Sequence, residues 1–306
     1  MTNAKTMTKR QYTWYLMKKN KSMYAMVAPF MLFFFVFTVL PVAISVYLSF
    51  TEYNVLQSAH FVGFKNYITL LLDDAIFLTA VKNTFLLALI IGPFGYIFSF
   101  LMAWLINELP RTLRTILTVI FYAPSISGNA YVVFTQLFSG DPYGFVNARL
   151  INWGIITDPI LWLKDSEYMM AVVILVSLWM SLGVGFLSFI AGLQGVDRAQ
   201  YEAAEVDGVK NRWQELWYVT LPNMKPQLLF GAVMSITGSF GFGGIVTALC
   251  GNPSTDYVAW TLQHHLGEYM TTRFEYGYAS AIAVVLFAIM MIANLLVQKF
   301  LAKVGQ

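Results

Sequence analysis

The sequence predicts an all-α, polytopic membrane protein with six transmembrane helices. Apolar residues make up 58% of its 306 residues and charged residues only 11%, and the mean hydropathy is +0.62. A soluble domain of this length needs far more surface charge. The sequence also contains six long uncharged stretches, which are residues 22–51, 83–107, 115–140, 168–196, 226–255 and 276–298. Each exceeds the roughly 20 residues that a helix needs to cross about 30 Å of hydrocarbon.

The basic residues predict that both termini face the cytoplasm. In that orientation only five of the 19 Lys and Arg residues lie on the outer side, namely Lys65, Lys82, Arg149, Lys164 and Arg273. Loops rich in Lys and Arg are retained in the cytoplasm during insertion. We therefore expect a multi-pass protein of the cytoplasmic membrane, surrounded by lipid. The net charge of +3 follows from this bias and does not call for a nucleic-acid partner.

The chain begins with a basic tail, residues 1–21, followed by an apolar run from Met23 to about Phe50. This run is longer than the roughly 7–15 apolar residues of a secretory signal, and no small-x-small cleavage pattern follows it. We therefore expect an uncleaved first transmembrane helix. Residues 53–79 then form an outer segment in which FVGFKNYITLL, residues 61–71, predicts a short interfacial helix.

The remaining connections are a tight cytoplasmic turn, residues 107–114, and two outer loops, residues 140–167 and 251–273. Cys250 is the single cysteine, so an internal disulfide is excluded and a packing role is expected. The pair His264-His265, with Glu268 nearby, raises the question of a metal site. Adjacent side chains on a helix point apart, so we do not predict one.

Residues 201–226 form a charged island between the fourth and fifth apolar stretches. They predict two short helices joined at Gly208, because glycine tolerates the left-handed conformation that ends many helices. Pro222 and Pro226 suit the first turn of the helical segments that follow. The apolar face of the second helix is formed by Trp213, Leu216 and Trp217.

Residue types alone leave two interpretations of this island open. In the first, it is an amphipathic loop that lies on lipid headgroups. In the second, it is a docking surface for another protein. Ala203 and Ala204 are small enough to allow close approach, and the carboxylates of Glu202, Glu205 and Asp207 can pair with a basic partner.

The island resembles the EAA loop found in permease subunits of binding-protein-dependent ABC importers. That pattern consists of Glu-Ala-Ala, three residues, Gly, a spacer, an apolar or β-branched residue, any residue, and Leu-Pro. The matching positions are Glu202, Ala203, Ala204, Gly208, Val219, Leu221 and Pro222. The spacer, Val209–Tyr218, is one residue longer than the usual one. This departure leaves the local register of the turn open.

Three further segments, residues 61–71, 123–154 and 276–287, resemble the first permease of carbohydrate importers of the maltose, lactose and glycerol-phosphate type. The resemblance implies the transmembrane domain of a type I ABC importer. It divides the chain into residues 1–76, with the tail, first span and outer segment, and a core of five helices, residues 77–300. The coupling loop of that core is residues 197–226.

The resemblance also implies partners. A second permease subunit completes a heterodimeric pathway, two ATP-binding cassette subunits dock below it, and an extracytoplasmic solute-binding protein delivers the sugar. ATP and Mg²⁺ belong to the ATPase subunits, since this chain contains no GxxxxGK[ST] run. We therefore expect a transport subunit with no catalytic residue, no bound cofactor and no metal.

Within the coupling loop, the resemblance assigns contact with the ATPase to seven residues. Glu202 is expected to pair with a basic ATPase side chain, and Asp207 and Gly208 to fix the turn. The other expected contact residues are Ala203, Ala204, Leu221 and Pro222.

A substrate path is predicted along the fourth and fifth spans, which border the sugar cavity in maltose-type permeases. Hydroxyl and small residues recur there on one helical face, with aromatic residues nearby. The expected lining residues are Ser177, Met180, Ser181, Val184, Thr237, Gly238 and Gly241. The alternative is that the small residues serve close helix packing in lipid.

Other functional classes fit the sequence less well. An ion-coupled transporter typically holds ionisable residues in the middle of its spans, whereas here Lys82 and Glu275 lie at span boundaries. A membrane enzyme or scaffold finds no support in any reactive constellation. An ABC importer for a non-sugar solute remains the main alternative.

Overall fold

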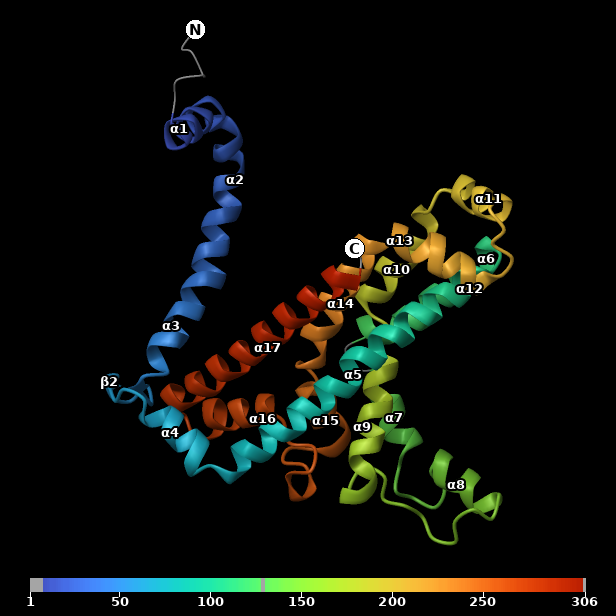
Figure 1. Ribbon diagram of the computed structural model, residues 1–306. Helices are drawn as coiled ribbons and strands as arrows, with labels where there is room; N and C mark the ends of the chain where they lie inside the picture. Colours follow the sequence, from blue (N-terminus) through green and yellow to red (C-terminus); the bar gives the residue numbers. More distant parts are fainter. Residues whose placement is uncertain (1–7, 128–129, 305–306) are drawn as a thin grey trace.

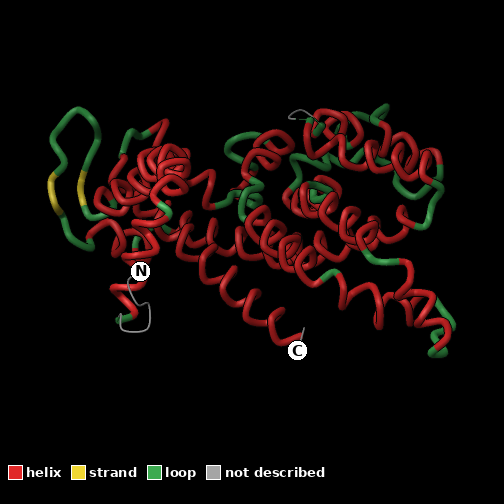
Figure 2. Tube along the Cα trace, turned by 90° about the horizontal axis from the view of Figure 1, so that it is seen from above, coloured by secondary structure: helices red, strands yellow, loops and turns green. Residues whose placement is uncertain are grey.

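The structure, a computed structural model, describes residues 8–127 and 130–304. Residues 1–7 of the predicted tail therefore lie outside it. The described chain is helical apart from one small sheet (Figure 1). Helices α1 and α11 and the C-terminal end of α17 lie toward one end of the molecule, and α4, α8 and α16 toward the other. Seen from above, the sheet lies at one edge (Figure 2).

Three of the six predicted spans are continuous helical segments. The first, Lys21–Leu48, consists of α2 (Lys21–Phe34), a π-helical turn η2 (Phe35–Val39) and α3 (Leu40–Leu48). The others are α5 (Ala75–Asn107) and α17 (Tyr276–Val304). Within the described chain, no residue in the most apolar window of the first span is buried, compared with 33% of the window in α5.

The other three predicted spans are pairs of helices that meet at an angle. They are α6 (Arg111–Ile126) with α7 (Tyr131–Leu137) at 89°, α9 (Ser166–Met180) with α10 (Val184–Gly195) at 40°, and α14 (Lys225–Ser239) with α15 (Gly243–Cys250) at 46°. The break in the first pair includes residues 128–129, which are not described. The described chain provides up to six candidate spans when each pair counts as one, in agreement with the prediction.

The remaining elements are short and lie outside the spans. On one side are α1 (Lys9–Lys19), α11 (Arg198–Val206), α12 (Arg212–Glu215), a π-helical turn η3 (Leu216–Thr220) and α13 (Leu221–Asn223). On the other are α4 (Lys65–Leu72), α8 (Phe145–Asn152), η4 (Thr255–Tyr257), α16 (Leu262–Gly267) and η5 (Glu268–Thr272). Helix α4 confirms the predicted helix in the outer segment.

The sheet was not predicted. Strands β1 (Thr51–Glu52) and β2 (His60–Phe61) pair antiparallel, with Thr51 opposite Phe61 and Glu52 opposite His60. Two residues per strand are too few to produce the alternating apolar pattern by which strands are recognised. The hairpin closes the connection between the first span and α4.

Helix α5 is the central element of the packing. Its N-terminal part contributes Phe77 to a buried cluster with α16 and α17, and its middle part contributes Leu87 to a cluster with α9 and α15. Its C-terminal part contributes Phe100 to a third cluster, with α10 and the coupling loop. Since lipid is as apolar as these side chains, close packing and hydrogen bonds hold such helices together.

Two of the helix breaks lie against glycines of α5. A Cβ atom at Gly95 would stand 2.9 Å from Ser181 Oγ, and one at Gly92 would stand 3.4 Å from Ser239 Oγ. Ser99 of α5 donates its hydroxyl to the backbone oxygen of Ser181 at 3.2 Å. The same oxygen accepts the N–H of Gly183 at 2.8 Å, so the backbone freed at this break is satisfied both locally and by a neighbouring helix, as hydrocarbon requires.

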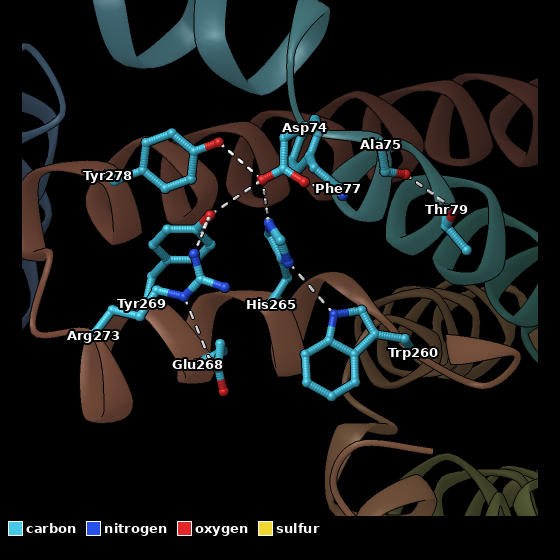
Figure 3. A network of polar contacts seen from close by, with 10 residues as sticks. All are labelled: Asp74, Ala75, Phe77, Thr79, Trp260, His265, Glu268, Tyr269, Arg273 and Tyr278. Atoms are coloured by element: carbon cyan, nitrogen blue, oxygen red, sulfur yellow. Dashed lines mark hydrogen bonds and ion pairs between the residues drawn. The ribbon is translucent and has the colours of Figure 1, made fainter. Parts of the chain in front are cut away.

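A polar network fixes the N-terminal end of α5 (Figure 3). Asp74 is the N-cap of α5, where its Oδ1 accepts the backbone N–H of Phe77 at 2.8 Å. Its Oδ2 lies 2.8 Å from His265 Nε2 of α16 and accepts the hydroxyl of Tyr278 of α17 at 2.9 Å. One carboxylate thus joins three elements that are distant in the sequence.

The network holds a neutral imidazole beside an ionised carboxylate. Trp260 Nε1–H, which can only donate, points at His265 Nδ1 at 3.4 Å, so Nε2 carries the proton toward Asp74. Burial lowers the pKa of His265 more than the neighbouring Asp74 raises it. Burial raises the pKa of Asp74, but the N–H of Phe77, His265 and Tyr278 together hold it below its usual range.

Asp74→Asn is expected to lower the free energy of unfolding by about 2 kcal/mol, because a hydrogen bond to a charged group is worth about 1.5–3 kcal/mol. Asparagine also caps helices well, so the loss reports the bonds to His265 and Tyr278. Unfolding in detergent is followed by the reaction of Cys250, the single thiol, with a fluorogenic dye. Asp73→Asn, at an exposed neighbour, is the control. Equal unfolding midpoints for Asp74→Asn and wild type would contradict this role.

Acidification is expected to destabilise the fold. The unfolded imidazole binds a proton near its ordinary pKa of about 6.5, whereas the pKa of His265 in the folded chain is lower. The contribution of His265 to the free energy of unfolding is therefore fully present above about pH 6.5, and it is lost as the pH falls below that value. His265→Gln should reduce the fall in melting temperature between about pH 7 and pH 5. The exposed His60→Gln should not, and an unchanged slope in His265→Gln would refute the assignment.

Candidate functional site

The coupling loop projects beyond the spans at the end of the molecule that carries α1 and the C-terminal end of α17 (Figure 1). Helix α10 ends at Gly195, and Asp197 begins α11 by accepting the backbone N–H of Ala199 at 3.0 Å. Among the described residues, none of those in α11 is buried. The helix therefore stands away from the protein body.

Gly208 ends α11 as predicted. Its φ of +94° is in the left-handed region, where a side chain would be strained. The N–H of Val209 donates to the backbone oxygen of Ala204 at 3.0 Å, and the N–H of Gly208 donates to the backbone oxygen of Glu205 at 3.1 Å. These two bonds form a Schellman motif, with Asp207 at the C-cap.

The one-residue-longer spacer coincides with a π-helical turn. After Asn211 caps α12 through the N–H of Gln214 at 2.9 Å, the chain passes into η3 and then into α13, which begins with Leu221-Pro222. A π turn bonds residue i to i+5 rather than i+4, so it takes up one extra residue and leaves the flanking turns in place. A turn of this kind therefore accommodates one extra residue between Gly208 and Leu221.

The Glu-Ala-Ala edge of α11 faces outward. The Glu202 side chain is 71% exposed, and its distance of 3.8 Å to Arg198 marks a weak ion pair between exposed groups. Ala203 is exposed and Ala204 is half-buried. Both alanines leave the edge smooth enough for another surface to approach.

Side-chain contacts connect α11 to the second half of its own loop. The hydroxyl of Tyr201 lies 2.9 Å from Thr220 Oγ1, and Asn223 Nδ2 donates to Gln200 Oε1 at 2.5 Å. Thr220 also donates to the backbone oxygen of Glu215 at 3.3 Å, across the π turn. A displacement of α11 therefore reaches η3 and α13 directly.

The second half of the loop is anchored in the protein body by buried side chains. Leu216 is buried in one cluster with Phe100 and Leu193, as is Met224. Of the predicted apolar face, Leu216 is buried, whereas Trp213 and Trp217 are 65% and 67% exposed in this chain. The apolar face thus divides between the protein core and the surface.

A polar cavity of about 690 Å³ lies between α11 and the C-terminal end of α5. Its charged lining consists of Glu108, Glu202, Glu205, Glu215, Arg198 and Arg212. Four carboxylates and two guanidinium groups leave the lining net negative, so it favours a cationic side chain. Glu108 and Arg212 were not predicted, since the sequence gives no signal that brings the turn at 107–114 to the coupling loop.

The residues predicted for the substrate path are distributed over several environments. Ser177 is fully buried, and within the described chain its hydroxyl has no hydrogen-bond partner. Ser181 lies at the break after α9 and donates to the oxygen of Leu178 at 2.6 Å, while Met180 is half-buried. The exposed members are Val184, Thr237, Gly238 and Gly241. The structure places Ser177 in the core and these four on the surface of the chain.

The adjacent histidines point to different partners. His265 belongs to the Asp74 network, whereas His264 Nε2 lies 2.9 Å from Thr247 Oγ1 and its Nδ1 lies 2.8 Å from Thr261 Oγ1. Among the residues that the structure describes, no group of three or more His, Cys, Asp or Glu side chains is arranged to hold a metal ion. The two imidazoles serve packing and hydrogen bonding here.

The chain is similar to transport proteins over most of its length. A probable ABC transporter permease, YesP of Bacillus subtilis, is 31% identical over 92% of this chain and 91% of its own length. The arabinooligosaccharide permease AraP of the same organism is 29% identical, covering 91% and 88%. The sulfoquinovosyl glycerol permease SmoG of Agrobacterium fabrum is 31% identical, covering 87% and 85%.

The fold is also found in a solved structure. A chain of a bacterial ABC transporter that imports alginate superposes with a TM-score of 0.78, covering 96% of this chain and 99% of that one, at 24% identity. The family model for the binding-protein-dependent transport system inner membrane component matches residues 95–306. The chain is a multi-pass membrane protein and a transport subunit rather than an enzyme, and it belongs to the family of inner membrane components of binding-protein-dependent transport systems.

Proposed function

We propose that the chain is a permease subunit of an ATP-driven importer that carries a sugar or oligosaccharide across the cytoplasmic membrane. The observation that carries this proposal is the outward-facing Glu202-Ala203-Ala204 edge, on a loop whose second half is anchored in the body through Leu216 and Met224. An exposed edge on a loop that is anchored in the protein core suits the docking of a second protein. With this loop in the cytoplasm, both termini are cytoplasmic as well.

The proposed assembly has three kinds of protein partner. A solute-binding protein delivers cargo from outside, as the alginate transporter has been solved with an alginate pentasaccharide-bound periplasmic protein. Two ATPase subunits dock on the coupling loops and hold ATP and Mg²⁺, while this chain binds neither. A second permease completes the pathway, and it or lipid covers the first span, which buries none of its apolar window within the described chain.

The coupling loop connects the ATPase docking site to the fourth and fifth spans, because the chain runs directly from those spans into the loop. Helix α11 follows α10, which ends the fourth span, and the loop ends at α14, which begins the fifth. Closure of the ATPase dimer displaces α11 and therefore moves the cytoplasmic halves of both bent spans. The two arrangements of the pathway are biased by nucleotide, as a two-state transporter requires.

Carbohydrate is the proposed cargo because named relatives carry arabinooligosaccharides, lactose and sulfoquinovosyl glycerol. The expected coupling contacts are Glu202, Ala203, Ala204, Asp207, Gly208, Leu221 and Pro222. The expected path combines Met180, Ser181 and Val184 with Thr237, Gly238 and Gly241, and Ser177 supports it from the core. An importer of a non-sugar solute is the alternative, which a cargo panel tests.

Glu202→Lys is expected to abolish ATP-driven uptake, because it reverses the charge that meets the basic ATPase side chain. Membrane insertion should be unchanged, since Glu202 is exposed. Uptake of radiolabelled lactose and arabinooligosaccharide and co-purification of the ATPase are measured together. Asp158→Lys makes the same charge change in an outer loop and should leave both readouts intact. Full transport and normal ATPase recovery with Glu202→Lys would refute the coupling role.

Ser181→Ala combined with Thr237→Ala is expected to lower uptake at limiting sugar by about tenfold, because the loss of hydrogen bonds worth about 0.5–1.5 kcal/mol each weakens binding. Uptake at saturating sugar should change little. Ser58→Ala, which removes a hydroxyl at an exposed position between β1 and β2, is the control and should leave uptake unchanged. Unchanged uptake by the double variant at limiting sugar would remove these residues from the path.

A further inference from the structure

Arg212 bridges the coupling loop and the cytoplasmic end of α5. Its Nη2 lies 2.7 Å from Glu108 Oε2, and its Nη1 lies 3.1 Å from Glu215 Oε2. Glu108 is the C-cap of α5, and Arg212 is the first residue of α12. A single guanidinium therefore joins a carboxylate of the body to a carboxylate of the loop.

Among the ion pairs between charged side chains in the described chain, this bridge is the one in which a single guanidinium pairs with two carboxylates. Arg198 and Glu202 lie 3.8 Å apart, with 93% and 71% of their side chains exposed. The carboxylates of Glu108 and Glu215 are only 35% and 17% exposed. Exposed pairs contribute little to stability, but removing Arg212 takes the shared counter-charge away from two neighbouring carboxylates, of which Glu215 is the more shielded.

A second contact reinforces the bridge. The rings of Trp104 of α5 and Trp213 of α12 have centroids 5.1 Å apart and are inclined by 52°. Trp104 and Glu108 are four residues apart and so lie on one face of α5, opposite the adjacent Trp213 and Arg212. The ring pair and the ion pair thus form a two-point attachment, which resists rotation of the loop against α5.

The attachment lies on the route from the docking edge to the spans. Helix α11, which has no buried residue in the described chain, contacts η3 through Tyr201 and Thr220, and a cavity separates it from the end of α5. Helix α5 in turn packs against α9, α10 and α14 and reaches the Asp74 network at its outer end. A movement of the loop is therefore transmitted to α5 at the contact between Arg212 and Glu108.

We propose that Arg212 is a positioning residue that clamps the coupling loop to α5 through Glu108, so that displacement of α11 is passed into the transmembrane helices. Without the clamp, the loop pivots about its own connections and ATP is hydrolysed without a matching movement of the spans. The inference rests on the proposed function, in which an ATPase moves α11. It assigns to α5 a part in coupling that the chain connections to α10 and α14 do not provide.

The clamp is tested in the assembled transporter, reconstituted with its ATPases and solute-binding protein. Arg212→Glu should keep ATPase co-purification but lower the amount of sugar moved per ATP by about tenfold, since repulsion between carboxylates replaces the bridge. Glu108→Arg should have the same effect. The exchange Arg212→Glu with Glu108→Arg should restore the ratio, because the new arginine faces both carboxylates. Lactose and arabinooligosaccharide are the transported probes.

Lys210→Glu, an equal charge reversal at an exposed position of the same loop, is the matched control and should leave the ratio unchanged. If the single variants do not accumulate in the membrane, Arg212→Lys is measured. It keeps the charge but cannot bridge both carboxylates, so a partial fall in the ratio is expected. A wild-type ratio in Arg212→Glu or Arg212→Lys, loss of ATPase binding, or failure of the exchange to restore coupling would overturn the clamp. Failure of the wild-type complex to move either probe would instead count against the proposed cargo.

Discussion

The close packing of α5 against its neighbours is the interaction on which the rest of the fold depends. Hydrocarbon offers no partner to a free backbone amide or carbonyl, so a broken helix must find one in the protein. Gly95 brings α5 close enough for Ser99 to reach the oxygen of Ser181 at the break between α9 and α10. The bend in the fourth span is therefore stabilised by α5, in addition to the local bond from the N–H of Gly183 to the same oxygen at 2.8 Å.

The coupling loop extends this packing into water. Its residues Leu216 and Met224 join the same buried cluster as Phe100 of α5, whereas α11 is held by a few polar side chains at the loop's far edge. The loop thus combines a fixed base with an exposed docking edge. A permease needs both, because the docking partner must find an accessible surface and the force it applies must not be lost in a flexible connection.

Much of this architecture could be predicted from local sequence. The six apolar stretches predicted the spans, because the length of an apolar run can be read from the sequence. Gly208 predicted the end of α11, because the conformational freedom of glycine is a property of that residue alone. The bends were hidden, since hydropathy counts apolar residues and does not register a change of direction. Asp74 and His265, 191 residues apart, and the contact of Arg212 with Glu108 were missed because only the three-dimensional packing brings them together. The sequence also did not reveal that Ser177 is buried whereas Val184, Thr237, Gly238 and Gly241 of the predicted path are exposed, because burial depends on the three-dimensional packing.

Helix α5 has a carboxylate at each end, and the two meet different solutions. With the loop in the cytoplasm, Glu108 lies on the side whose acidity the cell regulates, whereas Asp74 lies toward a medium whose acidity the cell does not control. Acid outside then weakens the Asp74 network through the imidazole of His265, while the buried cluster around Phe77 keeps that end of α5 in place. The acidity of the medium is therefore expected to change how stable this end of the helix is rather than where it lies.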